Sequence, residues 1–260
     1  MSGPQDDFQT TDDAFLGGKL MIRQTRRGSR AGIDAVFLAA ACPARAGERV
    51  LDVGSGSGIV ALAIARRVEG VNVTGLEIDA QLCALAGENA RENGLSSRAG
   101  FLCGDVTGPS ASLFATGLSP DSFDHAVANP PFLSEQETRP PPEPMLRRAH
   151  TLAPGDLERW VRCLAIFVKP GGTMTIVHRA DALPRLLEHC SGRFGALTVY
   201  PLFPREGAPA SRIILQGRKG SRAPVRLLPG MTLHMAGRDF TSSAQAILRD
   251  GVSLEVTPSK

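Results

Sequence analysis

The segment D-V-G-S-G-S-G at residues 52–58, called the glycine loop below, constrains the fold of this chain more than any other feature. It follows the short apolar run at residues 49–53 and precedes an apolar segment at residues 59–68. A strand, a glycine-rich turn and a helix form the first unit of a doubly wound α/β sheet. Glycine lets the backbone adopt positive φ and approach a ligand closely. The sequence therefore predicts a ligand site at the carboxyl end of the first strand of such a sheet.

Strands and helices alternate along the next part of the chain. Strands are expected at residues 72–78, 99–104, 123–129 and 173–178, and helices at residues 80–93, 155–168 and 183–190. This alternation is typical of a mostly parallel, Rossmann-like α/β sheet with helices on both faces. Two last strands, at residues 196–203 and 211–217, are separated by a short polar loop, which favours an antiparallel hairpin near the sheet edge.

The segments around this alternating core suggest four regions. Residues 1–13 are polar and expected to be disordered, and residues 14–48 are expected to form a hairpin and a helix that pack over the cofactor site. Residues 49–217 form the α/β domain, and residues 218–260 form a basic extension with a possible strand at 231–234 and a helix at 242–248. A proline-rich stretch at residues 133–153 interrupts the domain, and loops of this length are often lids or binding loops.

Composition limits the class of protein without choosing the function. The 260 residues are 42% hydrophobic and 21% charged, enough for a packed core, and the net charge of +3 permits a nucleic-acid partner without requiring one. The 5 cysteines form no C-x-x-C pair and are expected to be reduced core thiols. The polar N-terminus is not a signal peptide, and the apolar run at residues 35–42 is too short to span a membrane. We expect a cytoplasmic protein without a membrane partner and without a metal site.

Two ligands fit a glycine loop with this spacing. Gly56-x-Gly58-x-x-Ala61, with Glu77 at the end of the second strand, also fits a dinucleotide fingerprint. Asp52 argues against it, because a carboxylate at the loop repels a pyrophosphate and attracts the ammonium and sulfonium of S-adenosylmethionine. Glu77 can then accept hydrogen bonds from both ribose hydroxyls, and Asp105, after the third strand, from the adenine amino group. S-adenosylmethionine is therefore favoured over NAD.

The tetrapeptide Asn129-Pro130-Pro131-Phe132 follows the fourth strand, where the same ligand site is expected. A conjugated amino group is a poor nucleophile because its lone pair is delocalised. The side-chain oxygen of Asn129 and the carbonyl of Pro130 can each accept one N–H, which directs the lone pair toward the methyl donor, and Phe132 offers an aromatic face for a planar group. These residues are predicted to catalyse by positioning, with no strong general base.

Taken in order, D-V-G-S-G-S-G, G-L-E-I-D, C-G-D-V and A-N-P-P-F resemble the motifs of class I S-adenosylmethionine-dependent methyltransferases. The resemblance covers residues 49–132 and implies a seven-stranded sheet with an antiparallel last strand. It assigns cofactor binding to Asp52, Gly54, Ser55, Gly56, Gly58, Glu77, Ile78, Asp105, Val106 and Asn129.

A closer resemblance, over residues 14–220, is to the bacterial tRNA(Val) adenine-N6 methyltransferase group. It is carried by FLGGKLMIRQTRRGSRAGIDAVFLAA, NPPF, RRAHTLAPGDLERW and PLFPREGAPASRIILQGRKG. The resemblance implies that adenine 37, immediately 3′ of the anticodon, is the acceptor. It also implies that Arg30, Gly32 and Asp34 lie over the methionine side of the cofactor, and that Arg147 or Arg148 lies near the substrate.

Basic residues cluster in residues 19–30, in the loop after the tetrapeptide and in residues 205–226. Such clusters are typical of proteins that bind a polyanion, and the scarcity of aromatic residues favours a folded RNA over an extended single strand. We expect tRNA as the partner. The candidate RNA-binding residues are Lys19, Arg23, Arg26, Arg27, Arg147, Arg148, Arg218, Lys219 and Arg222.

Three alternatives remain open from the sequence. A release-factor glutamine N5-methyltransferase uses a similar tetrapeptide, but it carries an N-terminal helical domain for which the short basic segment before residue 49 leaves little room. A ribosomal RNA guanine-N2 methyltransferase would also place a planar nitrogen at Asn129. An NAD-dependent oxidoreductase would use the glycine loop but has no use for the tetrapeptide.

Overall fold

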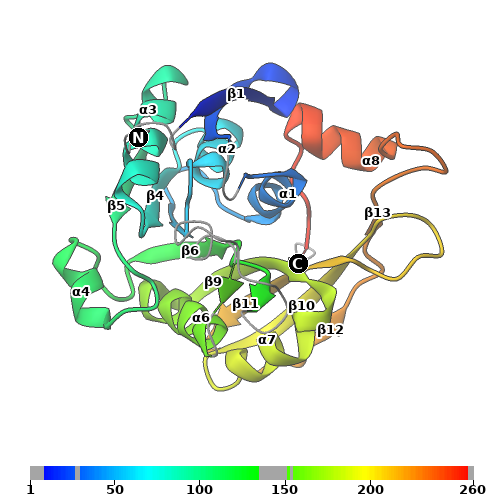
Figure 1. The fold of residues 1–260 in the computed structure, drawn as a ribbon. Coiled ribbons are helices and arrows are strands. Elements are labelled where there is room, and N and C mark those ends of the chain that lie inside the picture. Colours follow the sequence, from blue (N-terminus) through cyan, green and yellow to red (C-terminus); the bar gives the residue numbers. More distant parts are fainter. Residues whose placement is uncertain (1–8, 27–29, 135–150, 153–154, 257–260) are drawn as a thin grey trace, which may run out of the picture.

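A computed structural model describes residues 9–26, 30–134, 151–152 and 155–256 of the chain. Its main sheet has the strand order β12-β10-β11-β9-β6-β3-β4-β5, and β13 also pairs with β10 (Figure 1). The seven longer strands are β3 (Arg49–Val53), β4 (Asn72–Glu77), β5 (Ala99–Cys103), β6 (Phe123–Ala128), β9 (Val168–Arg179), β10 (Phe194–Phe203) and β11 (Arg212–Lys219).

The directions of these strands confirm the expected fold class. Strands β5, β4, β3, β6 and β9 are parallel, while β11 runs antiparallel to both of its neighbours, β9 and β10. This is a Rossmann-like sheet of seven strands whose last strand is reversed. The two-residue strands β12 (Arg226–Leu227) and β13 (Met231–Thr232) add to β10 beyond the expected seven, because the chain after β11 returns alongside that strand.

Helices cover both faces of the sheet, so the central strands β3 and β6 are buried along almost their whole length. Helices α1 (Ile33–Ala41), α2 (Ile59–Arg67) and α3 (Ala80–Glu92) lie on one face, and α6 (Asp156–Phe167) and α7 (Leu183–Cys190) lie on the other (Figure 1). Val50 and Val127 belong to the first core, while Leu51 and Ala126, one residue away, belong to the second. The short helix α4 (Ser110–Ala115) was not expected, and its Leu113 packs into the second core.

The N-terminal hairpin consists of β1 (Thr10–Phe15), the 3-10 turn η1 (Leu16–Gly18) and β2 (Leu20–Thr25). It begins four residues before the expected boundary at residue 14, because residues 10–13 pair along β2. Asn89 of α3 anchors this hairpin: its Oδ1 accepts from the Arg23 N–H at 2.9 Å, and its Nδ2 donates to the Ser57 carbonyl at 2.9 Å. The hairpin is thereby tied to the glycine loop.

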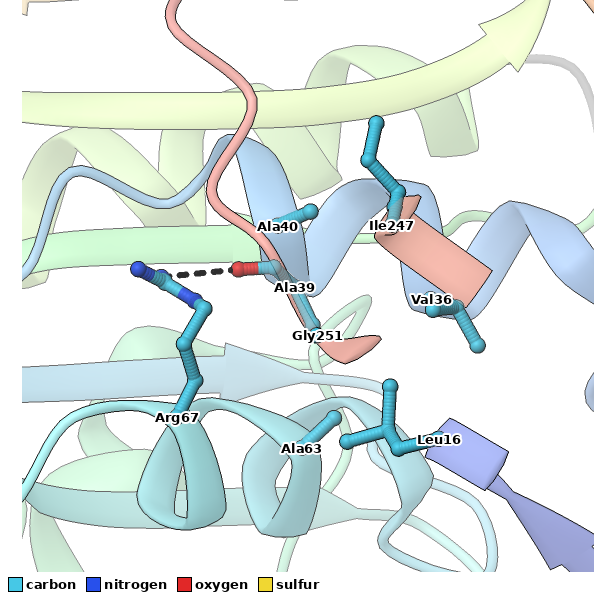
Figure 2. A pocket seen from close by; sticks show the side chains of 8 residues that line it. All are labelled: Leu16, Val36, Ala39, Ala40, Ala63, Arg67, Ile247 and Gly251. Atoms are coloured by element: carbon cyan, nitrogen blue, oxygen red, sulfur yellow. Dashed lines mark hydrogen bonds between the residues drawn. The ribbon is translucent and has the colours of Figure 1, made fainter. Parts of the chain in front are cut away.

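The C-terminal extension packs against α1 through α8 (Ser242–Gln245) and the adjoining π-helical turn η3 (Ala246–Asp250). Figure 2 shows Ile247 and Gly251 beside α1, around a cavity of about 10 Å³ that has room for at most one water molecule. Arg67 donates to the carbonyls of Ala39 and Cys42, at 3.0 and 2.6 Å, and so satisfies carbonyl groups at the last turn of α1.

The remaining elements are the paired strands β7 (Leu133–Ser134) and β8 (Thr151–Leu152) and the turn η2 (Ala180–Ala182).

The topology gives the sheet two distinct edges. The carboxyl edge is formed by the residues that follow β3, β4, β5, β6 and β9. Arg212, which begins the reversed strand β11, lies at this edge because it pairs with Arg179 at the end of β9. Arg218 pairs with Thr173 near the start of β9 and therefore lies at the opposite, amino edge. Within the described ranges, no helix is long and apolar enough to cross a membrane.

Candidate active site

The glycine loop is held against the end of β4. The N–H groups of Gly54 and Ser55 both donate to the Leu76 carbonyl, at 2.8 and 3.0 Å. The Gly56 N–H donates to Oε2 of Glu77 at 2.8 Å, and the other oxygen of Glu77 accepts from the Asp79 N–H at 3.0 Å. A carboxylate has about four acceptor positions, so Glu77 keeps acceptor capacity for a ligand. The structure thus joins the loop directly to the carboxylate expected to bind the ribose.

Gly54 must be glycine because Trp160 lies against it. Its φ is +72°, and a Cβ at this position would stand 2.3 Å from the Trp160 ring, which is only 7% exposed. Gly56 also has a positive φ, +54°, but a Cβ at that position would meet no atom within 4 Å. The sequence pattern assigned no role to Trp160. We find that it supports the back of the loop, while the Gly56 side of the loop is open.

Asp52 lies inside the protein, beside the first turns of α2. Its Oδ2 accepts from the Ala61 N–H at 3.1 Å, and its side chain is almost fully buried. Burial, opposed by this hydrogen bond and assisted by the charge of Glu77, raises the pKa of Asp52 to about 7. Burial also raises the pKa of Glu77 above its ordinary value. A cationic ligand would favour the ionised form of both groups, whereas a phosphate would be repelled by that form.

The ends of β4 and β5 complete the side of the site expected to hold adenine. Ile78 is 46% exposed, which leaves its side chain available to a flat ligand. Asp105 accepts from the N–H and the hydroxyl of Thr107 through one oxygen, at 2.8 and 2.7 Å. Its neighbour Val106 is half-buried and packs against the core. These residues lie at the carboxyl edge, next to the glycine loop in the strand order.

The tetrapeptide Asn129–Phe132 continues directly from β6, on the other side of β3. The Asn129 Oδ1 atom is buried and has no hydrogen-bond partner among the described residues. A buried unsatisfied acceptor costs about 1–3 kcal/mol, so such an atom in a native protein calls for an explanation. Pro130 is buried and Pro131 half-buried, which fixes the backbone that carries the Pro130 carbonyl. An acceptor substrate that brings an N–H to Asn129 would satisfy the orphan oxygen.

Phe132 is held between two side chains that the sequence pattern did not assign to the site. The guanidinium carbon of Arg212 lies 4.7 Å from the centroid of the Phe132 ring. The His178 ring packs nearly perpendicular to it, with 5.1 Å between the centroids. His178 is 1% exposed, and neither ring nitrogen has a hydrogen-bond partner among the described residues. Burial lowers the pKa of His178 to about 4, so this ring is neutral near pH 7.

The residues expected over the methionine end of the cofactor have protein partners. Asp34, near the start of α1, accepts from the Nε of Arg212 at 3.0 Å, and Arg30 pairs with Asp13 and donates to Thr11. Gly32 caps the N-terminus of α1 with its backbone. Of these residues the structure connects Asp34 to the tetrapeptide Asn129–Phe132, through Arg212.

The cations expected to bind RNA are scattered. Arg23 pairs with Asp12, Glu88 and Glu92, and Lys19 donates to the Asp250 carbonyl. At the amino edge, Arg218 donates to the Gly171 carbonyl, Lys219 pairs with Asp121, and Arg222 is exposed just beyond β11. Arg26 is exposed beside Gln9, while Arg27, Arg147 and Arg148 lie outside the described residues. The structure does not bring the described members of this set together, and it separates Arg218, Lys219 and Arg222 from the tetrapeptide by the length of the sheet.

The residues present fit S-adenosylmethionine. Open space above Gly56, spare acceptor positions on Glu77 and a buried carboxyl at Asp52 match an adenosine linked to a cationic amino-acid chain. The orphan oxygen of Asn129 can accept an N–H from a substrate amine. In the described part of the chain, no group of three or more His, Cys, Asp or Glu side chains is arranged to hold a metal ion.

Comparisons with known proteins agree with this geometry. A family model described as methyltransferase small domain matches residues 29–155. A relative from Porphyromonas gingivalis, named tRNA1(Val) (adenine(37)-N6)-methyltransferase, is 30% identical over 67% of this chain and 68% of its own length. One of the same name from Erwinia tasmaniensis is 26% identical over 92% of this chain and 94% of its own length. A solved structure from Agrobacterium tumefaciens, described as a predicted O-methyltransferase, has a TM-score of 0.72 and 25% identity, covering 85% of this chain and 98% of that one.

Proposed function

The chain belongs to the methyltransferase family of these relatives and uses S-adenosylmethionine, and we propose that it methylates the exocyclic N6 of an adenine in tRNA. The finer assignment is adenine 37 of tRNA(Val), the acceptor named in the relatives. Residues 49–217 form the methyltransferase domain in this proposal, residues 14–48 and 218–260 flank it, and the cytoplasm is the proposed location.

The observation that carries the proposal is the orphan Oδ1 of Asn129 at the end of β6. This oxygen accepts one N–H of the acceptor amine, and the Pro130 carbonyl accepts the other. The two bonds turn the nitrogen lone pair out of conjugation and toward the glycine loop. The cofactor supplies an electrophilic methyl group on a sulfonium. The amine proton becomes acidic as the new N–C bond forms, so no side chain with a matched pKa is needed at this position.

Phe132 supports a planar acceptor more readily than a flexible one. An aromatic ring next to the orphan amide oxygen can stack against a purine whose N6 lies at Asn129. A hydroxyl acceptor, as in the O-methyltransferase description of the Agrobacterium structure, has a single O–H and would leave one of the two acceptors, Asn129 Oδ1 or the Pro130 carbonyl, unused. The site geometry therefore favours a nitrogen acceptor over an oxygen acceptor.

The experiment is methyl transfer with a panel of acceptors, followed by digestion and mass spectrometry. The panel contains tRNA(Val) transcript, the same transcript with guanine in place of adenine 37, ribosomal RNA and a peptide release factor. We expect N6-methyladenosine in the first transcript and none in the second. A product on glutamine, guanine or a ribose hydroxyl, with unmodified adenine 37, would overturn the substrate assignment and leave the methyltransferase assignment intact.

A further inference from the structure

Phe132 is the aromatic residue that an acceptor base needs, and in this structure a cation already covers it. The guanidinium carbon of Arg212 lies 4.7 Å from the ring centroid, a distance typical of a cation–π contact. The ring also contacts His178. The two residues that contact Phe132 differ in exposure. His178 is 1% exposed and lies inside the protein, whereas the Arg212 side chain is 30% exposed. Of the two, the Arg212 contact is the one that can open toward solvent.

The Arg212 guanidinium is hydrogen-bonded at two of its three nitrogens within the described part of the chain. Its Nε donates to Oδ2 of Asp34 at 3.0 Å, and its Nη1 donates to its neighbour's carbonyl, Ser211, at 3.1 Å. No hydrogen bond joins its Nη2 to another described residue. The pair brings together the first turn of α1 and the start of β11, which are 178 residues apart in sequence. Asp34 thus holds the guanidinium beside Phe132, and Nη2 is left without a hydrogen bond to the described residues.

The spacing requires a movement when a base binds on this face. Two stacking contacts of about 3.5 Å each need about 7 Å between the walls of a slot, against the 4.7 Å found here. A planar group can therefore enter only if the guanidinium withdraws by roughly 2–3 Å, which rotation about the single bonds of the Arg212 side chain can provide when the Asp34 side chain follows. After such a shift, the flat guanidinium stacks on the outer face of the base, and its free amino group can bond a flanking phosphate.

We propose that Arg212 is a substrate-binding residue that forms the movable wall of the acceptor slot, with Asp34 as its positioning residue. In the free protein Arg212 occupies the face of Phe132 that the base takes. In the complex it closes over the base. This inference rests on the planar acceptor of the proposed function and adds to it the residue that captures the acceptor.

The test uses Arg212→Ala, Arg212→Lys and Asp34→Asn in the full-length protein, with Arg91→Ala as matched control. Arg91 is an exposed arginine of α3, and its loss changes the net charge by the same amount. Each variant is assayed with whichever acceptor the wild type methylates in the panel above. We measure KM for that acceptor, kcat, affinity for S-adenosylhomocysteine by calorimetry, and melting temperature.

We expect KM to rise about tenfold for both Arg212 variants, which corresponds to about 1.4 kcal/mol, in the range of a desolvated cation–π contact. Lysine keeps the charge but lacks the planar group, so Arg212→Lys is expected to fail like alanine. Asp34→Asn should raise KM by a smaller factor, and kcat and cofactor affinity should change less than threefold in all three variants. Arg91→Ala should match the wild type.

Two outcomes would overturn the proposal. Wild-type KM in Arg212→Lys would mean that charge alone matters and that no stacked wall exists. Loss of cofactor affinity in Asp34→Asn, with unchanged KM, would return Asp34 to the cofactor site predicted from sequence. Failure of the proposed function is a separate outcome. In that case the wild type methylates a different acceptor of the panel, while the KM ratio between the Arg212 variants and the wild type is still measured on that acceptor.

Discussion

The two ends of strand β11 carry similar cations in different surroundings. At the carboxyl edge, Arg212 lies over Phe132 and is oriented by Asp34. At the amino edge, Lys219 pairs with Asp121 and donates to the Val168 carbonyl at 2.8 Å. Both residues belonged to one basic cluster by sequence. The difference teaches that the direction of a strand, and not the local density of charge, decides which cation can reach the site.

The same contrast applies to the sheet as a whole. Within the described residues, the carboxyl edge carries an orphan amide oxygen, buried carboxyls with raised pKa values and an open glycine loop. The polar groups named at the amino edge are paired with one another, as in the ion pair of Lys169 with Asp124. The unsatisfied polar groups named at the carboxyl edge can bind a ligand, whereas the paired polar groups named at the amino edge stabilise the fold. The following predictions test this contrast.

The largest effect is expected from Gly54→Ala, at the carboxyl edge. Its Cβ would stand 2.3 Å from the Trp160 ring at a φ of +72°, so either the loop or α6 must move. We expect the free protein to lose about 2–3 kcal/mol of stability and to lose measurable cofactor binding. Thermal melting and calorimetry with S-adenosylhomocysteine measure the two losses.

Gly56→Ala is the matched control for this change. It carries a similar backbone strain but meets no atom within 4 Å. The free variant should therefore melt closer to the wild type than Gly54→Ala does, while cofactor affinity still falls, because the new methyl group enters the space assigned to the ligand. Normal cofactor affinity in Gly56→Ala would show that the ligand does not use the open side of the loop.

An intermediate effect is expected on the pH dependence of cofactor affinity. The pKa of Asp52 is about 7 in the free protein, and a cationic ligand favours its ionised form and lowers that pKa. Binding then releases a proton below pH 7, so affinity should fall by up to about tenfold per pH unit as pH drops below 7 and should level off above it. Calorimetric titrations at a series of pH values measure this slope.

Asp52→Asn should abolish the slope and weaken binding at pH 8, where the wild-type carboxylate is ionised. The effect of Asp52 on the stability of the free protein has the opposite pH dependence. Because its folded-state pKa is raised, Asp52 contributes its full stabilisation below about pH 4, and this contribution is lost as pH rises through 7. Asp52→Asn should therefore raise the melting temperature of the free protein at pH 8. A wild-type affinity independent of pH between 5 and 8 would remove Asp52 from the account.

The smallest effect is expected from Lys219→Met, at the amino edge. The ion pair with Asp121 contributes to stability, and its loss should cost at most about 1 kcal/mol. Methylation of tRNA should stay within twofold of the wild type. The sequence interpretation predicts instead weaker RNA binding, with the salt dependence of log K reduced by about one. Filter binding over a salt series decides between the two.

The fold was predictable because its signals are local. A glycine-rich turn after an apolar strand, followed by repeated strand and helix patterns, leads to the parallel sheet, and the short loop after β10 leads to the reversed strand β11. The carboxylates Asp52, Glu77 and Asp105 and the residue Asn129 are predictable because each lies at or just after the carboxyl end of a strand. Parallel strands bring such residues to one edge.

The missed features depend on tertiary contacts that no local pattern records. Trp160 meets Gly54, and Arg212 meets Asp34 and Phe132, across more than seventy residues of sequence in each case. The start of β1 was missed because its polar residues show no apolar alternation and are ordered by pairing with β2. His178 was within an expected strand, but only the structure shows that its ring is buried against Phe132.

The central claim is that Asn129 acts on the acceptor and not on the fold. The most direct measurement compares cofactor affinity with single-turnover methyl transfer in Asn129→Ala. We expect S-adenosylhomocysteine to bind within about threefold of the wild type, while the rate of methyl transfer falls by about 10²–10³, as for loss of one preorganised polar group at a reacting atom. A variant that transfers methyl groups at the wild-type rate, or that loses rate only in proportion to cofactor affinity, would contradict the account.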